Sequence, residues 1–565
     1  MDLPHFDITT IPFSRRGSWL SLSPIVGLHD RREHIHLVSH QTGIHPILRI
    51  ELSAEVTEVA ANPATLTWIA PAGRIEAAFE SLDTVRLRGH GVGARLADAA
   101  GGLTPFTGTY LFVDPRDGAV VLTSYETGRR YRVTLLEGTW EVMGDQLLGA
   151  GDRHIALTSP AWEVAIEEYE TTRPPYRQGM TLDECAAHSA QDFDAYARAI
   201  APWEDGRFPA ARRAAYVLWS ATVSPKGFVQ RESVLMSKHW MNKVWSWDHC
   251  FNALALAPGL PQSALDQFLV VFDHQDEHGA VPDSVTHSEI LDNFVKPPIH
   301  GWALCQLLER LEAPPSRGEL AEIYDKLARW TEFWLDSRRV PGSALPHYQH
   351  GNDSGWDNST MFDNDRVVEA PDLAAFLVLQ LSALVTLGTS LGHDVGRWER
   401  ERDAVEGALF SRLHTGDGFV AIGVPNGRVS TTSSLLNLMP IVLGERLTAD
   451  VASRLSERIA AHLTQWGLAT ELPSSREYLA DGYWRGPIWA PSTVLIEDGL
   501  RRAGATDLAN EISERFRGLC EASGFAENFD ALTGEGLRDR AYTWTASAYL
   551  LLCAQAAERE RTAAA

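Results

Sequence analysis

The feature that most constrains the fold of this chain is a change in hydrophobic period near residue 175. Before it, apolar and polar residues alternate in short runs such as "EHIHLVSH" (33–40), "ATLTWIA" (64–70) and "RYRVTLLEG" (130–138). A period of two is typical of strands with one buried face. After it, apolar residues recur at i, i+3 and i+4, the period of amphipathic helices. The sequence therefore predicts a mostly α protein with an N-terminal β domain.

Residues 1–175 are expected to form an antiparallel β-sandwich. Further alternating runs occur at 46–54, 84–91 and 108–125, and Asp117-Gly118 divides the last of these. Asp-Gly between two alternating runs is a strong signal for a β-hairpin. Many short strands separated by turns favour two packed antiparallel sheets.

A connection and a helix start mark the domain boundary. Residues 171–180, "TTRPPYRQGM", combine two prolines with polar residues and predict a linker. Thr181 and Glu184 then have the spacing of a capping box, which predicts a helix over 182–200. With 565 residues the chain exceeds the size of a single core, so we assign 1–175 and 176–565 to separate domains.

The second domain is expected to be helical throughout. Helical periodicity occurs near 182–200, 208–223, 249–258, 262–277, 299–313, 317–337, 370–393, 396–413, 432–442, 448–466, 491–503, 507–522 and 543–561. About a dozen helices can form a bundle, a superhelix or a closed toroid. Periodicity alone does not distinguish these arrangements.

Charge and cysteine usage narrow the partners and the compartment. The formal net charge of −24 opposes binding to nucleic acid or to an anionic membrane. We find no apolar run long enough to cross a bilayer, and the first residues lack the order of a secretion signal. Five widely spaced cysteines are expected to be reduced core residues of a cytoplasmic protein: Cys185, Cys250, Cys305, Cys520 and Cys553.

The unusual residues gather in four segments at helix starts or between helices. These are "KVWSWDHCF" (243–251), "GNDSGWDNSTMFDND" (351–365), "DGYWRGPIWAP" (481–491) and "GFAENFDALTGEG" (524–536). Functional groups are often carried on loops of a rigid scaffold. If the helices close into a ring, these four loops can meet at one mouth.

Two carboxylates in these loops are candidates for acid–base chemistry. Asp357 follows Trp356, and a carboxyl group against an aromatic wall loses hydration, which raises its pKa and favours a general acid. Glu527 lies between Phe-Ala and Asn-Phe, where simple solvation is not expected. Taken singly, Asp357 also fits a helix cap or an Asx-turn, and Glu527 a structural role. As a pair, one acid and one base are what hydrolysis of a glycosidic bond needs.

The aromatic and polar residues of the loops favour a carbohydrate ligand. Rings can stack on sugar faces, and amides, carboxylates and guanidinium groups can bind hydroxyls. Each ring taken alone fits core packing equally. The candidates are Trp245, Trp247, Trp356, Tyr483, Trp484, Trp489 and Trp544 for stacking, and Asp248, Gln275, Asn358 and Arg485 for hydroxyl groups.

Two motifs suggest a metal site, and neither is strong enough to predict one. His274, Glu277 and His278 match the H-x-x-E-H pattern of zinc peptidases, but Gly279 and Pro282 end any helix there at once. Asp353, Asp363 and Asp365 lie close in sequence without the order of an EF-hand, so a structural calcium is not predicted either. We expect no metal and no cofactor.

Together, "WSWDHCF", "SGWDNS", "YWRGPIW" and "ENFDALTGEG" resemble the glycoside hydrolase family 63 group and its mannosylglycerate and glucosylglycerate hydrolase-like relatives. A more distant likeness is to trehalases. The resemblance covers roughly residues 210–560. It implies an (α/α)6 toroid and an inverting mechanism on α-glycosides, in some members behind an N-terminal β-sandwich.

The resemblance also assigns roles to residues. It implies that Asp357 is the general acid and Glu527 the general base. Two sugar-binding segments are implied as well, one at Trp247 and Asp248 and the other at Tyr483, Trp484, Arg485 and Gly486. Relatives commonly have Glu-Ser-Gly where this chain has Asp353-Ser354-Gly355, which leaves the sugar preference open.

The expected partner is a small carbohydrate, an α-glucoside or α-mannoside of a short oligosaccharide or glycosyl solute. A monomer and a homo-oligomer are equally compatible with the sequence. A non-hydrolytic carbohydrate-binding protein stays as the alternative, although binding alone does not require both Asp357 and Glu527.

Overall fold

The computed structural model of the chain describes residues 3–100, 109–148, 151–416 and 418–564. These residues pack into two compact units. Unit 1 comprises Met1–Ala199, Arg212–Lys243 and Thr286–Glu289, and unit 2 comprises Ile200–Ala211, Val244–Val285 and Ile290–Ala565. A linear boundary between residues 175 and 176 stays a prediction, because these units are defined by packing and not by sequence order.

Unit 1 contains the expected antiparallel β-sandwich. In its described residues, one sheet has six strands in the order β1-β2-β3-β8-β13-β12 and the other has eight in the order β4-β5-β6-β7-β14-β11-β10-β9. The strands are β1 (Leu20–Gly27), β2 (Asp30–Ser39), β3 (His45–Leu52), β4 (Glu58–Ala61), β5 (Leu66–Ala70), β6 (Gly73–Phe79), β7 (Thr84–His90), β8 (Ala94–Asp98), β9 (Thr109–Val113), β10 (Val120–Ser124), β11 (Arg130–Glu137), β12 (Trp140–Met143), β13 (His154–Leu157) and β14 (Ala161–Tyr169).

Sequence alternation and turn chemistry explain these strands. In β5, Leu66, Trp68 and Ala70 are buried while the residues between them are partly exposed. The Asp117-Gly118 hairpin is confirmed, since β9 pairs antiparallel with β10 around it. Gly118 has φ +76°, a left-handed conformation that glycine adopts without steric cost.

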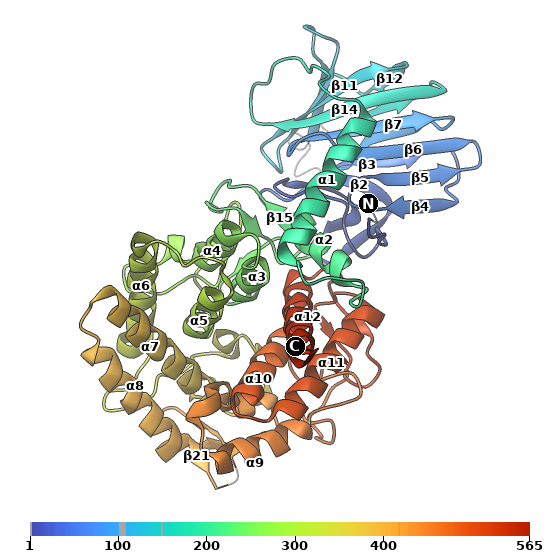
Figure 1. Cartoon of the computed structure of the whole chain (residues 1–565). Helices are drawn as coiled ribbons and strands as arrows, with labels where there is room; N and C mark the ends of the chain where they lie inside the picture. The colour runs from blue at the N-terminus through green and yellow to red at the C-terminus, as the bar shows by residue number, and fades with distance from the viewer. Residues whose placement is uncertain (1–2, 101–108, 149–150, 417, 565) are drawn as a thin grey trace. The chain divides into compact units, whose positions relative to one another are not determined.

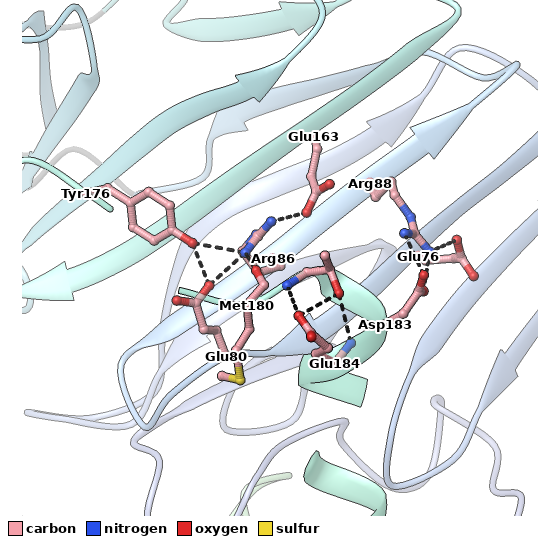
Figure 2. A network of polar contacts seen from close by, with 10 residues as sticks. Glu76, Glu80, Arg86, Arg88, Glu163, Tyr176, Met180, Asp183 and Glu184 are labelled. Atoms are coloured by element: carbon pink, nitrogen blue, oxygen red, sulfur yellow. Dashed lines mark hydrogen bonds and ion pairs between the residues drawn. The ribbon is translucent and has the colours of Figure 1, made fainter. Parts of the chain in front are cut away.

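The segment between β14 and the first helix has no helix or strand, yet it is bound to the larger sheet (Figure 2). The buried guanidinium of Arg86 on β7 donates to the Tyr176 hydroxyl at 2.9 Å and to the Met180 carbonyl at 3.0 Å. It also forms ion pairs with Glu80 and Glu163. The connection is therefore a packed element of unit 1 and not a free tether.

The first helix starts at the predicted capping box. The Glu184 backbone N–H donates to the Thr181 hydroxyl at 3.2 Å, and the Thr181 N–H donates back to the Glu184 carboxylate at 2.8 Å. This helix, α1, spans Leu182–Ile200, and α2 spans Ala211–Ala221. A short hairpin, β15 (Thr222–Val223) with β16 (Ser233–Val234), follows α2.

Unit 2 contains the closed inner ring of six segments expected of the predicted (α/α)6 toroid (Figure 1). In its described residues, six segments contact one another in turn and the last, α12, packs on the first, α3. This inner ring consists of α3 (Asp248–Leu256), α5 (His300–Arg310), α7 (Pro371–Leu391), the 3-10 segment η6 (Leu435–Arg446), α10 (Ala490–Arg502) and α12 (Thr543–Ala564). The outer layer contains α4 (Pro261–Leu269), α6 (Arg317–Glu332), α8 (Gly396–Ala408), α9 (Ala449–Ala460) and α11 (Thr506–Ser523).

Short elements in the loops of unit 2 hold the chain between helices. Small sheets join β17 (Val244–Trp245), β18 (Ser284–Val285) and β19 (Ile290–Leu291), and also β20 (Val368–Glu369), β23 (Ala421–Gly423) and β24 (Val429–Ser430). Two further hairpins are β21 (His414–Thr415) with β22 (Gly418–Phe419), and β25 (Asn528–Phe529) with β26 (Gly536–Leu537). Single turns of 3-10 or π helix are η1 (Phe272–His274), η2 (Phe333–Ser337), η3 (Gly351–Ser354), η4 (Thr360–Phe362) and η5 (Leu409–Leu413).

Three expectations from sequence need correction. The helix predicted over 262–277 ends at Leu269, and only the short η1 follows. Residues 432–442 do not form an α-helix, because Pro440 removes a backbone donor and Gly444 leaves helical geometry. Cys305 is exposed on α5, whereas the other four cysteines are buried as expected; all five are free thiols.

Helix α7 also corrects the statement that no apolar run could cross a membrane. Its 21 residues have a mean hydropathy of 1.8 in the most apolar window, enough by length and composition for one span. Most of its side chains are buried against α5, α6, α8 and η6. A helix that is apolar on all sides is expected at the centre of a large helical unit, and α7 is such a core helix.

Candidate active site

The four unusual loops each precede an inner segment of the unit 2 ring. Trp247 is the N-cap of α3 and Asp248 its first residue, and Trp489 is the N-cap of α10. Asp357 lies between η3 and η4 ahead of α7, and Glu527 directly precedes β25 ahead of α12. The ring thus carries side chains from distant parts of the sequence on corresponding loops.

Asp357 is a partly exposed carboxyl group in a mostly buried loop. Burial raises its pKa, while the nearby charge of Lys296 lowers it and that of Asp283 raises it. Among the described residues, no hydrogen bond or ion pair joins its carboxylate to another side chain. A carboxyl group that is desolvated but not tied to a partner is suited to exchange a proton with a ligand.

Asp353, four residues earlier, is different. Its carboxylate accepts from the backbone N–H of Val295 at 3.2 Å and of Gln349 at 2.9 Å, and it pairs with Arg338 at 2.8 Å. Asp353 is 1% exposed. Asp353 is buried and holds the loop in place through these contacts. The two acids of "GNDSGWDNST" therefore differ: Asp353 is structural, and Asp357 is the one available to a ligand.

Glu527 is buried and its pKa is raised to about 8, chiefly by burial and then by the charge of Asp539. The charge of Arg538 opposes this rise, and the charge of Asp357 adds to it. The β25–β26 hairpin holds the residue, because Asn528 pairs with Leu537 and the Glu527 N–H donates to the Asp539 carbonyl at 2.7 Å. Asp357 and Glu527 therefore lie within electrostatic reach of each other.

A third carboxyl group, Asp248, belongs to the same cluster. Burial raises its pKa to about 8, with Lys296 lowering it and with Asp283 and Asp357 raising it further. The buried Lys296 ammonium pairs with Asp283 at 2.8 Å and donates to the Asn352 carbonyl at 2.8 Å. The Lys296 ammonium also lies 5.4 Å from the centre of the Trp245 ring. One cation thus faces three carboxyl groups.

Two tyrosines confirm that the loops converge. The pKa of Tyr483 is raised by burial and then by the charges of Glu527, Asp357 and Asp248. The pKa of Tyr542 is raised by burial and then by Glu527 and Asp248. Carboxylates from three loops can raise the pKa of one phenol only if those loops lie close together, so the loops share one site.

Five of the six predicted tryptophans form a continuous buried chain. Trp356 stacks on Trp484 with ring centroids 4.7 Å apart, and Trp484 stacks on Trp489 at 4.0 Å. Trp489 contacts Trp544, which contacts Trp247 at 5.0 Å. All five rings are buried. These rings pack mainly against one another beneath the polar groups of the loops. Direct stacking of a sugar on them stays a prediction.

The polar groups of Asn358 and Arg485 connect two loops. The Asn358 amide donates to the Gly482 carbonyl at 3.0 Å and accepts from the Trp484 N–H at 3.0 Å. Arg485 donates to the Asn358 carbonyl at 2.7 Å and pairs with Asp363. Gly486 has φ +152° and lies against the Leu479 carbonyl. Sugar binding by these residues stays a prediction.

Gln275 lies at the end of η1, where its amide donates to the carbonyls of Gly279 at 2.8 Å and Lys326 at 3.0 Å. Both contacts are to backbone, so its donor group is already used in holding the loop. Binding of a sugar by Gln275 likewise stays a prediction.

The two metal motifs do not assemble. Glu277 and His278 are exposed and lie outside any helix, so the one-turn spacing that zinc ligands need is absent. Arg338 pairs with Asp353, Arg485 with Asp363 and Asn426 with Asp365. Over the residues that the structure describes, no group of three or more His, Cys, Asp or Glu could hold a metal ion.

Comparison with known proteins decides the family. The sequence profile of the mannosylglycerate hydrolase MGH1-like glycoside hydrolase domain matches residues 241–545, more than half of the chain. The chain belongs to this family. It is a glycosidase of the glycoside hydrolase family 63 type.

The names of two relatives describe hydrolases of glycosylated glycerates. The mannosylglycerate hydrolase of Rubrobacter radiotolerans is 25% identical, over 54% of this chain and 89% of its own. The glucosylglycerate hydrolase of Mycolicibacterium hassiacum is 23% identical, over 60% of this chain and 96% of its own.

Solved structures support the fold of the chain. The family 63 mannosylglycerate hydrolase from Thermus thermophilus, in complex with glucose, has a TM-score of 0.55 and 21% identity, over 60% of this chain and 99% of that one. A bacterial glucoamylase complexed with acarbose has a TM-score of 0.63 and 10% identity, over 99% of this chain and 96% of that one.

Four residues of the site were not predicted from the sequence. They are Lys296, Asp283, Arg538 and Tyr542. Arg538 and Tyr542 lie within six residues of the end of the Glu527 segment, so their position was a usable signal. Lys296 precedes two prolines before α5, and Asp283 precedes β18; neither has a local signature.

Proposed function

We propose that this enzyme hydrolyses the α-glycosidic bond of a small glycosyl solute, an α-mannoside or α-glucoside of glycerate, with inversion at the anomeric carbon. Asp357 is the general acid and Glu527 the general base in this proposal. The names of the relatives support the substrate class. The proposal needs no metal or cofactor, and the compartment proposed is the cytoplasm.

One observation carries the assignment. Asp357 and Glu527 come from different loops, and burial raises the pKa of both. The negative charge of each also raises the pKa of the Tyr483 phenol. The loop motifs assign the two roles. A general base must be ionised, and with a pKa of about 8 Glu527 loses its proton as the pH rises toward 8, so activity should rise over that range. Asp353, which is nearer in sequence to Asp357 than any other carboxylate of its loop, is fully engaged and unsuited to either task.

The reaction then balances as a single displacement. The Asp357 carboxyl group donates its proton to the glycosidic oxygen as the bond from that oxygen to the anomeric carbon breaks. A water attacks the anomeric carbon from the opposite face and gives its proton to Glu527. The products are the free sugar with inverted configuration and the protonated aglycone, and inversion requires the two carboxyl groups to be separated by roughly 6.5–9.5 Å.

The first test replaces each carboxyl group by its amide. Asp357→Asn and Glu527→Gln should each lower kcat on mannosylglycerate or glucosylglycerate by about 10²–10⁴-fold, while circular dichroism shows that each variant keeps its fold. Asp450→Asn, on the exposed side of α9, is the matched control and should retain activity. Full activity of either site variant would exclude the proposed pair.

A second test separates the acid from the base. An α-glycosyl fluoride has a leaving group that needs little protonation, so Asp357→Asn should retain much of its activity on this substrate. Glu527→Gln should not, because water still needs a base. Proton NMR of the first product should show the β-anomer, and initial release of the α-anomer would refute inversion.

A panel of α-glycosides decides between hydrolysis and simple binding. If mannosylglycerate and glucosylglycerate bind in calorimetry and are not cleaved, the protein is a carbohydrate-binding member of the family. Cleavage of one of them identifies the sugar, and cleavage of neither together with cleavage of another α-glycoside replaces the glycerate assignment.

A further inference from the structure

Tyr483 has a backbone conformation that a tyrosine rarely adopts. Its φ is +63°, in the left-handed region, where a side chain with a Cβ atom is disfavoured. Such residues cost about 1–3 kcal/mol and persist only where the surroundings hold them. In this site the surroundings that hold Tyr483 can be named.

The backbone on both sides of Tyr483 is held by one side chain, the amide of Asn358. It donates to the Gly482 carbonyl and accepts from the Trp484 N–H, both at 3.0 Å. The two peptide groups that flank Tyr483 are thereby fixed from outside their own loop. Asn358 is the residue next to Asp357, so the loop of the acid sets the conformation of Tyr483.

The ring and carbonyl of Tyr483 are held from the other side. The Trp489 indole N–H donates to the Tyr483 carbonyl at 2.9 Å, and the Arg538 guanidinium lies 5.0 Å from the centre of the phenol ring. Arg538 itself has φ +61°. It is fixed by an ion pair with Asp481 at 2.7 Å and by the Asn528 side chain at 2.9 Å.

The contacts of Tyr483 come from the loops that carry the two proposed catalytic carboxyl groups. Asn358 adjoins the acid, while Arg538 and Asn528 belong to the hairpin of the base. Tyr483 is thus held through its backbone by the residue next to the proposed acid, and its ring is contacted by a residue next to the hairpin of the proposed base. Tyr483 and Arg538 both have positive φ and lie in contact, and their contacts join the acid loop, the Tyr483 loop and the hairpin of the base.

We propose that Asn358 and Arg538 are positioning residues that hold the phenol of Tyr483 between the general acid and the general base. This inference rests on the proposed function. The Tyr483 hydroxyl then orients the water and Glu527 during the displacement. Asn358 acts through the backbone of Tyr483, and Arg538 acts through its ring.

Double-mutant cycles test this inference, because residues that act through one group have non-additive effects. Asn358→Ala should lower kcat by about 10–100-fold, the loss expected for misplacement of a catalytic group by about 1 Å, with KM changed by less than about three-fold. In a Tyr483→Phe background, which lacks the hydroxyl, the same substitution should cost less than about three-fold. Independent, multiplied losses would overturn the inference.

Arg538 provides a second, independent readout. Arg538→Gln removes both the stacking and the positive charge, so kcat should fall and the acidic limb of the pH profile, which follows Glu527, should move to higher pH. Arg538→Lys keeps the positive charge but loses the contact of the planar guanidinium with the Tyr483 ring. The acidic limb of the pH profile should therefore stay at the same pH while kcat falls. An unchanged kcat in Arg538→Lys would overturn the role of the ring contact.

Controls separate these effects from general damage. Asn510→Ala on α11 and Arg454→Ala on α9 remove exposed polar contacts far from these loops in sequence and should leave kcat unchanged. If Asn358→Ala does not fold, Asn358→Asp replaces it, since it keeps an acceptor for Trp484 and loses the donor to Gly482. If Asp357→Asn and Glu527→Gln are fully active, the proposed function fails; if they are inactive and the cycles are additive, this inference alone fails.

Discussion

Gly355 lies directly against the indole ring of Trp247. A Cβ atom on Gly355 would lie 2.3 Å from Cζ2 of that ring, and the glycine has φ +74°. Trp247 is the N-cap of α3, and Gly355 stands two residues before Asp357. The absence of a side chain at residue 355 therefore brings the loop of the proposed acid onto the start of an inner helix.

Gly355→Ala should displace the acid loop and lower both stability and activity. The contact falls well inside van der Waals distance, the ring is buried and cannot move away, and the left-handed φ adds strain for alanine. We expect a destabilisation of about 2–4 kcal/mol and a kcat loss of at least about ten-fold. Chemical denaturation and steady-state kinetics measure the two effects.

Gly407→Ala is the matched control. This glycine lies inside α8, and no atom lies within 4 Å of an added Cβ. Alanine favours helix over glycine by about 1 kcal/mol, so this variant should be as stable as the parent or more stable. A Gly355→Ala variant that behaves like Gly407→Ala would contradict the close contact.

Asp353→Asn should destabilise the protein without changing its pH–rate profile. The substitution leaves the Arg338 guanidinium, which is mostly buried, without its carboxylate, and two backbone N–H groups lose charge-assisted bonds. Breaking a buried pair from one side costs about 3–5 kcal/mol. Urea unfolding measures this cost, and adding Arg338→Gln should recover part of it. A shift of the pH–rate profile in Asp353→Asn would instead make Asp353 part of the catalytic machinery.

Local sequence was sufficient where the physics is local. The capping box of Thr181 and Glu184, the Asp117-Gly118 turn and the alternating strands each depend on contacts within a few residues, and the structure contains them. The closed ring was not available from periodicity, because α12 and α3 meet only in three dimensions. It came from the resemblance carried by four loop motifs.

The site was predicted less completely for the same reason. The contrast between Asp353 and Asp357 depends on Arg338 and on backbone groups in other segments. The partners of Asn358 are 124 and 126 residues away in sequence, so its amide could only be assigned to a ligand. The sequence identified the tryptophans as a group. It could not show that they stack mainly on one another, because that depends on which residues are their neighbours in space.

Chelation should leave the activity unchanged. Glu277 and His278 are exposed and not on a helix, and the proposed mechanism uses two carboxyl groups without a metal. The variants Glu277→Gln and His278→Ala should stay within about two-fold of the parent, as for other exposed positions. Assays after dialysis against EDTA and metal analysis of the protein check this. Activity that disappears with EDTA and returns with zinc would contradict it.

Asp248→Asn should stabilise the protein increasingly as the pH rises, at the expense of activity. The folded-state pKa of Asp248 is about 8, raised from an ordinary value of 3.8 mainly by burial. Between these values the folded protein holds a proton that the unfolded chain releases, so the contribution of this group to stability falls as the pH rises. It is fully present below about pH 4 and is lost once the pH passes about 8. Asparagine has no such dependence.

The difference in unfolding temperature between Asp248→Asn and the parent should therefore grow from about pH 5 to about pH 8, reaching about 2–4 °C, and level off above that range. Differential scanning calorimetry across this range measures it. Glu527→Gln should behave alike, because burial also raises the pKa of Glu527 to about 8. Asp450→Asn, at an exposed position, should show a difference that does not vary with pH. A gain for Asp248→Asn that shrinks as the pH rises would mean that Asp248 is ionised and stabilised in the folded protein, with Lys296 outweighing its burial.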